Sequence, residues 1–204
     1  MLYYDHAMLG ITVALAAGVH RRHGWPLIVT AGVAAMLPDW DGLSKLAGPE
    51  AYREVHRTWG HNLLAAPLAS GLFAGAAYLC YVSGGGRPTA RAGHERPRAG
   101  PTFSGHALGV WVAVGVLVAL SHVLADLVYC GRRLSPDWPV ALLWPFSPRR
   151  WGYPLVPWSD LGVTLLLVGE MLALCVCASR ARLLACATLL AVFGYVGVRG
   201  LWAE

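Results

Sequence analysis

The chain has 204 residues, of which 56% are hydrophobic and only 13% are charged. Long apolar runs dominate it to an extent that excludes an ordinary soluble domain, and we expect an all-α polytopic membrane helical bundle of about five to six helices. The formal net charge of +5 comes mostly from arginines in the loops between these runs. That placement favours topology signals and contacts with lipid phosphates, and argues against nucleic-acid binding.

The apolar runs predict six helices in chain order. They cover about residues 4–19, 26–37, 62–82, 105–129, 159–178 and 182–201. The first two are short for a hydrocarbon core of about 30 Å, so we expect their polar ends to lie in a protein-lined cleft. The string "HRRHGW" at residues 20–25 predicts a turn between them, and residues 39–60 predict a polar loop with a short helix.

The stretch at residues 83–104 differs from the rest of the chain because it is rich in glycine, proline and arginine. Such a composition cannot bury a hydrophobic core, so it predicts a flexible basic loop. The five cysteines lack CxxC spacing, and three of them lie inside apolar runs, which indicates small packing residues. We therefore interpret residues 1–204 as a single membrane-embedded domain.

Successive helices of a bundle cross in opposite directions, so their connections alternate between its two ends. Residues 20–25, 83–104 and 179–182 fall at one end, and the N-terminus with residues 39–61 falls at the other. The second end gathers ionisable side chains from separate segments: Asp5, His6, Asp39, Asp41, His56, His61, His122, Asp126 and Asp160. Ionisable groups at membrane depth are costly and usually mark function.

The string "SHVLAD" places His122 and Asp126 four residues apart in one expected helix. Side chains at this spacing share a helical face and can converge on one ion. An imidazole nitrogen and a carboxylate oxygen suit zinc, and also manganese or iron. Taken alone, the pair is somewhat better explained as a neutral, hydrogen-bonded His–Asp pair.

Two loop strings add further candidate ligands. In "LPDWDG", Asp39 and Asp41 follow a helix end, where carboxylates two residues apart can bind one cation, although a solvated turn is the simpler interpretation. In "HRTWGHN", His56 and His61 are five residues apart, which is a poor spacing for one helical face. If the chain turns near Gly60, both can face inward.

Arg57, in the same string, offers a fixed fork of donors suited to phosphate or carboxylate, and the alternative is a basic interfacial loop. His6 is the weakest candidate by spacing and is otherwise a histidine at a helix end. Three segments rich in His and Asp still meet at one end of the bundle, and a fourth offers His6, which favours a metal site. The predicted metal ligands are His6, Asp39, Asp41, His56, His61, His122 and Asp126.

Together these residues resemble a known family. The motifs of the YdjM-like inner-membrane metal-dependent hydrolases are similar to His6, Pro38-Asp39-x-Asp41, His56-Arg57-x-x-x-His61 and His122-x-x-x-Asp126, and the similarity covers most of the chain, including "LLWPF". The family tends to read His-Arg-Gly-x-Thr-His-Ser, whereas this chain has Thr58, Gly60 and Asn62 at the three small positions. The family is distantly similar to zinc-dependent phospholipase C and single-strand nucleases, and this chain lacks their further His-x-x-x-Glu pair.

These features predict a membrane-bound hydrolase that cleaves a phosphoester of a lipid or lipid-linked substrate with a metal-activated water. The expected cofactor is one or two zinc ions, with manganese or iron as alternatives. Asp39 and Asp126 would act at the metal, either Asp39 or Asp41 could serve as base, and Arg57 would orient the phosphate. The alternatives are a non-catalytic metal-binding or ion-carrying membrane protein, and a structural protein in which the polar cluster is a satisfied network.

The sidedness of the protein follows from the arrangement of its basic residues. The sixteen Arg and Lys divide eight and eight between the two ends, but Glu95 is the lone acid at the end that carries residues 83–104. Arginines in short loops resist translocation, so this end is predicted to be cytoplasmic. The predicted site then lies at the outer face of a bacterial-type cytoplasmic, or inner, membrane.

Two further features have functional and plain interpretations. Glu170 lies inside an expected helix and is either a ligand, a partner of a ligand, or a protonated carboxyl buried in the bundle. The segment around Trp138, Trp144, Trp151 and Trp158 is rich in proline, which prevents a regular span. It is expected to form an interfacial cover over the site or a simple aromatic belt.

Overall fold

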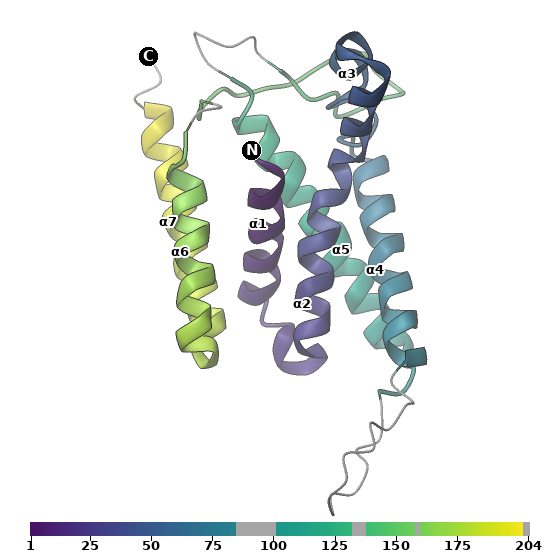
Figure 1. Cartoon of the computed structure of the whole chain (residues 1–204), viewed down its shortest axis with the longest axis vertical. Helices are drawn as coiled ribbons and strands as arrows, with labels where there is room; N and C mark the ends of the chain where they lie inside the picture. Colours follow the sequence, from purple (N-terminus) through teal and green to yellow (C-terminus); the bar gives the residue numbers. More distant parts are fainter. Residues whose placement is uncertain (85–100, 132–137, 158–159, 202–204) are drawn as a thin grey trace, which may run out of the picture.

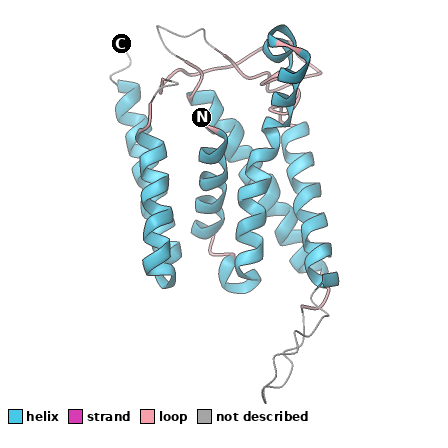
Figure 2. Ribbon diagram, in the orientation of Figure 1, coloured by secondary structure: helices cyan, strands magenta, loops and turns pink. Residues whose placement is uncertain are grey.

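The structure is a computed structural model that describes residues 1–84, 101–131, 138–157 and 160–201. This part of the chain is helical, as Figures 1 and 2 show, and it contains no strand beyond an isolated bridge between Val140 and Trp151. The elements are α1 (Tyr3–Ala16), α2 (His20–Met36), the 3₁₀ helix η1 (Leu37–Ala47), α3 (Pro49–Val55), α4 (Ala65–Gly84), α5 (Gly105–Val128), α6 (Gly162–Cys177), the 3₁₀ turn η2 (Ala178–Arg180) and α7 (Ala181–Leu201).

The long helices stand side by side, and η1 and α3 sit together at one end of the bundle (Figure 1). Helix α1 packs against α2, α5 and the α6–α7 hairpin, while α4 packs against α2 and α5. Leu15, Leu27 and Val118 are fully buried in the core between α1, α2 and α5. The prediction of an all-α bundle is therefore confirmed, with a short helix in the loop after α2 as expected.

Among the described residues, three stretches are long and apolar enough to cross a membrane. These are Ala65–Gly84, Gly105–Val128 and Gly162–Leu201, the last of which contains both helices of the α6–α7 hairpin. Large apolar side chains such as Leu72, Leu165 and Phe193 remain exposed on these helices, as expected for a surface in contact with lipid. Helices α1 and α2 have 14 and 17 residues and are shorter than α4, α5 and α7, as the sequence predicted.

The start of α2 differs from the prediction. The turn expected at residues 20–25 lies earlier, because His20 to His23 already form a helical turn. The chain then kinks at Gly24, where φ is +75°, before Pro26 continues the helix. Glycine is the residue that adopts this left-handed conformation without steric cost, so the kink was encoded by Gly24 itself. Of the basic loop predicted at 83–104, residues 85–100 lie outside the described residues.

Small residues let the helices approach closely. A Cβ atom added to Gly115 of α5 would overlap the backbone carbonyl of Ser70 and lie 2.8 Å from Cβ of Ala74, both on α4. Gly10 of α1 is equally close to Ala35 of α2. Between apolar helices in a membrane, such close packing replaces the hydrophobic effect as the main source of association.

We expect Gly115→Ala to destabilise the protein by about 1–3 kcal/mol, because the added methyl group must push α4 away from α5. Gly109 is a matched control on the same helix, since a Cβ atom there would meet no atom within 4 Å. Gly109→Ala should be neutral or slightly stabilising because alanine favours helix. Thermal unfolding of the purified protein in detergent measures both, and equal midpoints would contradict the proposed packing role.

Candidate metal centre

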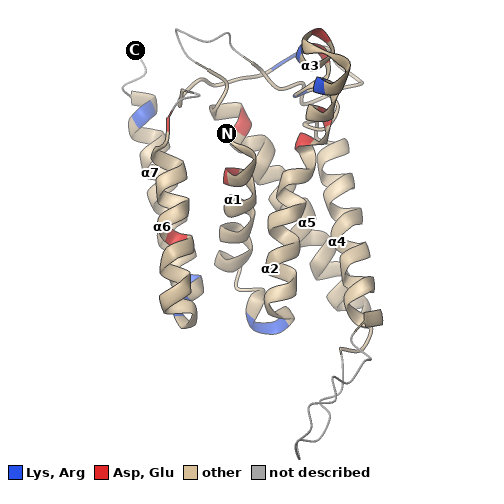
Figure 3. Ribbon diagram, viewed as in Figure 1, with Lys and Arg blue, Asp and Glu red and all other residues tan. Residues whose placement is uncertain are grey.

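The predicted site residues come from four segments and meet at the end of the bundle that carries η1 and α3. His122 and Asp126 lie on α5, Asp39 and Asp41 on η1, and His6 on α1, while His56, Arg57 and His61 belong to the connection between α3 and α4. All of them are buried except Asp39, which has intermediate exposure. The side chains of Asp39 and His56 are 8% and 9% exposed. Figure 3 shows acidic residues concentrated toward this end.

Asp39, His61, His122 and Asp126 form an inner group with a geometry that suits one metal ion. Nε2 of His61 lies 3.1 Å from Nε2 of His122, 3.3 Å from Oδ1 of Asp39 and 3.2 Å from Oδ2 of Asp126. Nε2 of His122 lies 3.8 Å and 3.7 Å from the same two oxygens. Tetrahedral ligands of zinc are roughly 3.3–3.4 Å apart, so these donor atoms could hold zinc with little movement.

The hydrogen bonds on the far side of each imidazole prepare it for this role. Nδ1 of His122 lies 2.7 Å from the backbone carbonyl of Ala35, which can only accept, so Nδ1 carries the proton. Nδ1 of His61 is held in the same way, 3.1 Å from Oδ2 of Asp41. With an ion bound, each ring would be neutral and would direct the lone pair of Nε2 into the inner group, as metal-binding histidines do.

Asp41 is the carboxylate that orders the connection between α3 and α4. Its oxygens accept from the backbone N–H of Gly60 at 2.9 Å and lie 2.8 Å from Nδ1 of His56 and 3.1 Å from Nδ1 of His61. Burial alone would raise the pKa of Asp41, but the hydrogen bonds with His56 and His61 outweigh it and lower the pKa to about 2.

Asp41, His56 and His61 form a second group close enough to hold a metal ion. The two groups share His61, and the sequence analysis assigned Asp41 and His56 as direct ligands. Because Asp41 already accepts three hydrogen bonds, the geometry favours it as the group that orients His61. His56 is enclosed by aromatic rings, stacked on Tyr52 at 4.7 Å and edge-on to Trp138 at 5.1 Å.

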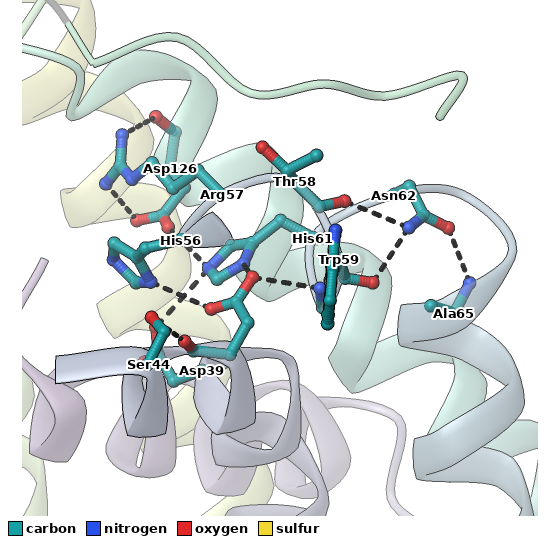
Figure 4. Close-up of polar contacts among 12 residues, drawn as sticks. Asp39, Ser44, His56, Arg57, Thr58, Trp59, His61, Asn62, Ala65 and Asp126 are labelled. Atoms are coloured by element: carbon teal, nitrogen blue, oxygen red, sulfur yellow. Dashed lines mark hydrogen bonds and ion pairs between the residues drawn. The ribbon is translucent and has the colours of Figure 1, made fainter. Parts of the chain in front are cut away.

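The remaining residues of the string "HRTWGHN" hold the ligands in place (Figure 4). A Cβ atom on Gly60 would overlap the carbonyl oxygen of Pro38, so glycine is required where this connection crosses η1. The side-chain amide of Asn62 donates to the carbonyls of Thr58 and Trp59. Its oxygen accepts from the backbone N–H of Ala65, the first residue of α4. Asparagine is among the residues that cap helix starts well, and Asn62 has this role at the start of α4.

Arg57 is buried, with 1% exposure, and points to Asp126 (Figure 4). Its guanidinium lies 2.8 Å from Oδ1 of Asp126 and donates to the backbone carbonyls of Asp126 and Trp138. Its φ of +62° makes it the single non-glycine residue with positive φ in the described chain. Its backbone carbonyl also accepts from Ala141. The sequence predicted that Arg57 would contact a phosphate. The geometry instead favours Arg57 as the group that holds Asp126 in position.

His6 lies on the other side of Asp126 and outside the inner group. Its Nε2 is 3.4 Å from Oδ1 of Asp126, and its ring stacks on that of His122 with centroids 3.6 Å apart. Two cationic rings would repel each other at this distance. The stacking therefore favours a neutral His122. His6 was predicted to be a metal ligand, but an ion bound to its Nε2 would lie beside Oδ1 of Asp126, the oxygen that Arg57 also binds.

Electrostatics of the inner group favour a positive charge at its centre. Burial lowers the pKa of His61, but the carboxylates of Asp126, Asp39 and Asp41 outweigh it and raise the pKa well above its usual value. The pKa of Asp39 is lowered despite burial, mainly by its hydrogen bond with His61. A divalent cation bound by Nε2 would supply this charge in place of a proton on His61.

Sequence reasoning missed the tyrosines beside the site. The hydroxyl of Tyr3 would lie 3.0 Å from a Cβ atom on Gly42, which places it next to Asp41. Burial raises the pKa of Tyr52 to about 12, with contributions from Tyr3 and Asp39, so its hydroxyl remains a donor at neutral pH. The signal for Tyr3 was its spacing of three residues from His6, which places both on neighbouring turns of α1.

The other predicted candidates lie outside the two groups. Asp160 accepts from the backbone of Gly162 and from the Tyr195 hydroxyl and pairs with Arg199, so it joins α6 to α7. Glu170 is buried and accepts a 2.7 Å hydrogen bond from Thr12 on α1. Neither is positioned to contact an ion in the inner group through these bonds.

The proline-rich segment after α5 lies against the site end. The backbone N–H of Ala141 donates to the carbonyl of Arg57, and that of Leu63 donates to Leu142. Trp144 stacks on Trp59 with centroids 6.0 Å apart. The described part of the segment is thus fastened to the loop that carries the histidines. The predicted contribution of Trp158 lies outside the described residues.

We expect the purified protein to bind one zinc ion per chain, and His122→Ala to lose it because one of four donors is removed. His106→Ala, on the opposite end of the same helix, should retain zinc. Asp41→Asn should weaken zinc binding by about 10–100-fold without abolishing it, since it removes an orienting carboxylate. Elemental analysis and competition with a chelating dye measure these differences, and full zinc occupancy in His122→Ala would contradict the inner group.

Comparisons with known proteins agree with the motifs. The sequence profile of the YdjM inner membrane protein family matches residues 1–204. No curated protein and no solved structure shows significant similarity to the chain. The resemblance seen in the motifs is therefore confirmed for the family, whereas the similarity to phospholipase C stays a prediction. Because the match extends over the whole sequence, the protein belongs to the YdjM inner membrane protein family.

Proposed function

We propose that the protein is a membrane-bound metal-dependent hydrolase that cleaves a phosphoester of a lipid or lipid-linked substrate. The observation that carries the proposal is the inner group of two imidazoles and two carboxylates, buried at the end of a membrane-type bundle. A zinc ion in such a group lowers the pKa of a bound water and neutralises charge on a phosphate oxygen. Manganese or iron would suit the same donor set.

The protein residues have distinct roles in this proposal. His61, His122 and Asp126 hold the ion, and Asp41 and Arg57 keep His61 and Asp126 in position through the bonds described above. Asp39 is the most exposed of the four inner donors, so a water molecule can replace it on the ion, or its carboxylate can accept a proton from that water. Because Arg57 is occupied, phosphate binding falls to groups at the surface of the site.

Lys45 is a suitable group for this contact. It is exposed at the end of η1, and its ammonium group lies 4.4 Å above the ring of Tyr52, which itself stacks on His56. The cation is therefore fixed near the histidines and faces outward, where an anionic headgroup arrives. Its flexible stem allows it to follow a phosphate into the site.

A specific observation favours a second function, that of a metal-binding protein without catalysis. The four inner donors would complete a tetrahedron, which is typical of structural zinc sites, whereas catalytic sites keep one position open. An ion carrier would also need a polar path across the bundle. Glu170 and Thr12 supply one buried polar pair for it.

The decisive test is hydrolysis by the purified protein in lipid vesicles, with a panel of glycerophospholipids and polyprenyl phosphates. We expect release of a phosphorylated product, and a rate at least about 100-fold lower in Asp126→Asn because the metal is lost. Lys45→Ala should raise KM without changing metal content, while the matched surface variant Arg53→Ala leaves KM unchanged. Stoichiometric metal with no hydrolysis of any substrate would favour the non-catalytic alternative.

We also propose that the site faces the outside of the inner membrane. The basis is the uneven balance of charge at the opposite end, where arginines in short connections have almost no acidic neighbours. In a cysteine-free background, Thr102→Cys should resist an impermeant thiol reagent in intact cells and react after lysis. Glu50→Cys on α3 should show the reverse accessibility. Labelling of position 102 in intact cells would place the site on the cytoplasmic side.

A further inference from the structure

A second polar site lies at the end of the bundle opposite the metal centre. Two adjoining hollows of about 370 and 480 Å³ open there, between the α1–α2 turn and the first residues of α5 and α7. Both are lined by Arg21, Arg22 and His23. We call this surface the basic pocket, and its basic residues are Arg21, Arg22, Arg182, His20, His23 and His106.

Within the part of the chain that the structure describes, the basic pocket has no acidic lining residue to balance its charge. The described residues that line the two hollows include no Asp or Glu, and the Arg–carboxylate pairs found among the described residues involve Arg57 and Arg199, which lie elsewhere. In Figure 3 the basic start of α2 and the α6–α7 turn both lie at this end. Several cations that converge without a counter-charge repel one another, so an anion bound among them would be stabilised.

The pocket is built, because the side chain of Arg182 is held in a defined position. Its Nε donates to the carbonyl of Ala16 at 3.1 Å, and its aliphatic part lies on Gly18, where a Cβ atom would be 3.4 Å from Cδ. Gly18 has φ of +73°, so a glycine both makes the α1–α2 turn and leaves room for this arginine. Arg182, although exposed, therefore lines the same hollow as Arg21 and Arg22 from a fixed position.

The floor of the larger hollow indicates its depth in the membrane. Tyr78, Tyr81 and Trp111 line it, and the rings of Tyr81 and Trp111 stack with centroids 5.7 Å apart. Tyrosine and tryptophan concentrate at the level of lipid headgroups. The cations therefore lie where the phosphate of a lipid, or a phosphate ion from the adjoining water, would be found.

We propose that the basic pocket binds a phosphate group, carried by an anionic phospholipid or by a soluble phosphate, on the membrane face opposite the metal centre. Guanidinium groups match the oxygens of a phosphate in pairs, and imidazole N–H groups can complete the set of donors. This proposal does not depend on hydrolysis, since none of these residues contacts the inner group.

The test compares the wild-type protein with the double variant Arg22→Gln/Arg182→Gln in detergent. Native mass spectrometry would count retained phosphatidylglycerol, and calorimetry with inorganic phosphate would measure the soluble ion. We expect one bound phosphate species in the wild type and a loss of affinity of about tenfold or more in the double variant. The matched control Arg53→Gln/Arg149→Gln, with two exposed arginines at the other end, should bind as the wild type does.

Three outcomes distinguish a lipid phosphate, a soluble phosphate and the absence of a phosphate site. Retention of phosphatidylglycerol that excess inorganic phosphate does not displace assigns the site to a lipid headgroup. Binding of inorganic phosphate with no preference for phosphatidylglycerol over phosphatidylcholine assigns it to a soluble phosphate. Equal binding by the wild type and the double variant, with unchanged zinc content and thermal midpoint as the check on folding, would overturn the proposal.

Discussion

The site depends on the hydrogen bonds of Asp41. This single carboxylate joins η1 to the connection between α3 and α4, because it accepts from the backbone of Gly60 and binds both His56 and His61. Asp41 holds Nδ1 of His61 on the side opposite the inner group, where Nε2 lies 3.1 Å from Nε2 of His122 on α5. A low pKa of about 2 means that Asp41 stays charged, and so remains an acceptor, at any physiological pH.

Asp126 has the corresponding role on the membrane helix. A buried carboxylate within a bundle is costly unless its charge is compensated, and here Arg57 at 2.8 Å and His6 at 3.4 Å share one oxygen. The other oxygen stays directed at His61 and His122. Division of the carboxylate in this way lets the same residue stabilise the fold on one side and offer a ligand on the other.

Much of this arrangement could be predicted from the sequence, because alternation of helix direction fixes which loops share an end. That argument alone predicts that Asp39, His61 and His122 come together from three distant segments. The separation of five residues between His56 and His61 also required a turn near Gly60, and the structure has one there. What the argument could not supply was the direction in which each side chain points.

Arg57 illustrates the limit. An arginine next to a histidine in a polar loop reads as a surface group for phosphate, and only the φ of +62° turns it inward to Asp126. Similarly, a sequence pattern cannot distinguish a candidate ligand such as Asp39 from a residue that would orient a ligand, such as Asp41. The two are separated by which face of His61 each one meets, and that depends on the path of the whole connection.

The choice between a catalytic and a structural metal centre rests on Asp39. His61 and His122 are locked by bonds to Asp41 and to the Ala35 carbonyl, and Asp126 is locked by Arg57. No comparable bond to its other oxygen is found for Asp39 in the described chain, and it alone among the four donors is not fully enclosed. It also belongs to a 3₁₀ helix, whose hydrogen bonds are weaker than those of an α-helix. Three rigid candidate ligands and one that can yield would suit the open coordination of hydrolytic zinc better than a closed structural site, and so support the proposed function.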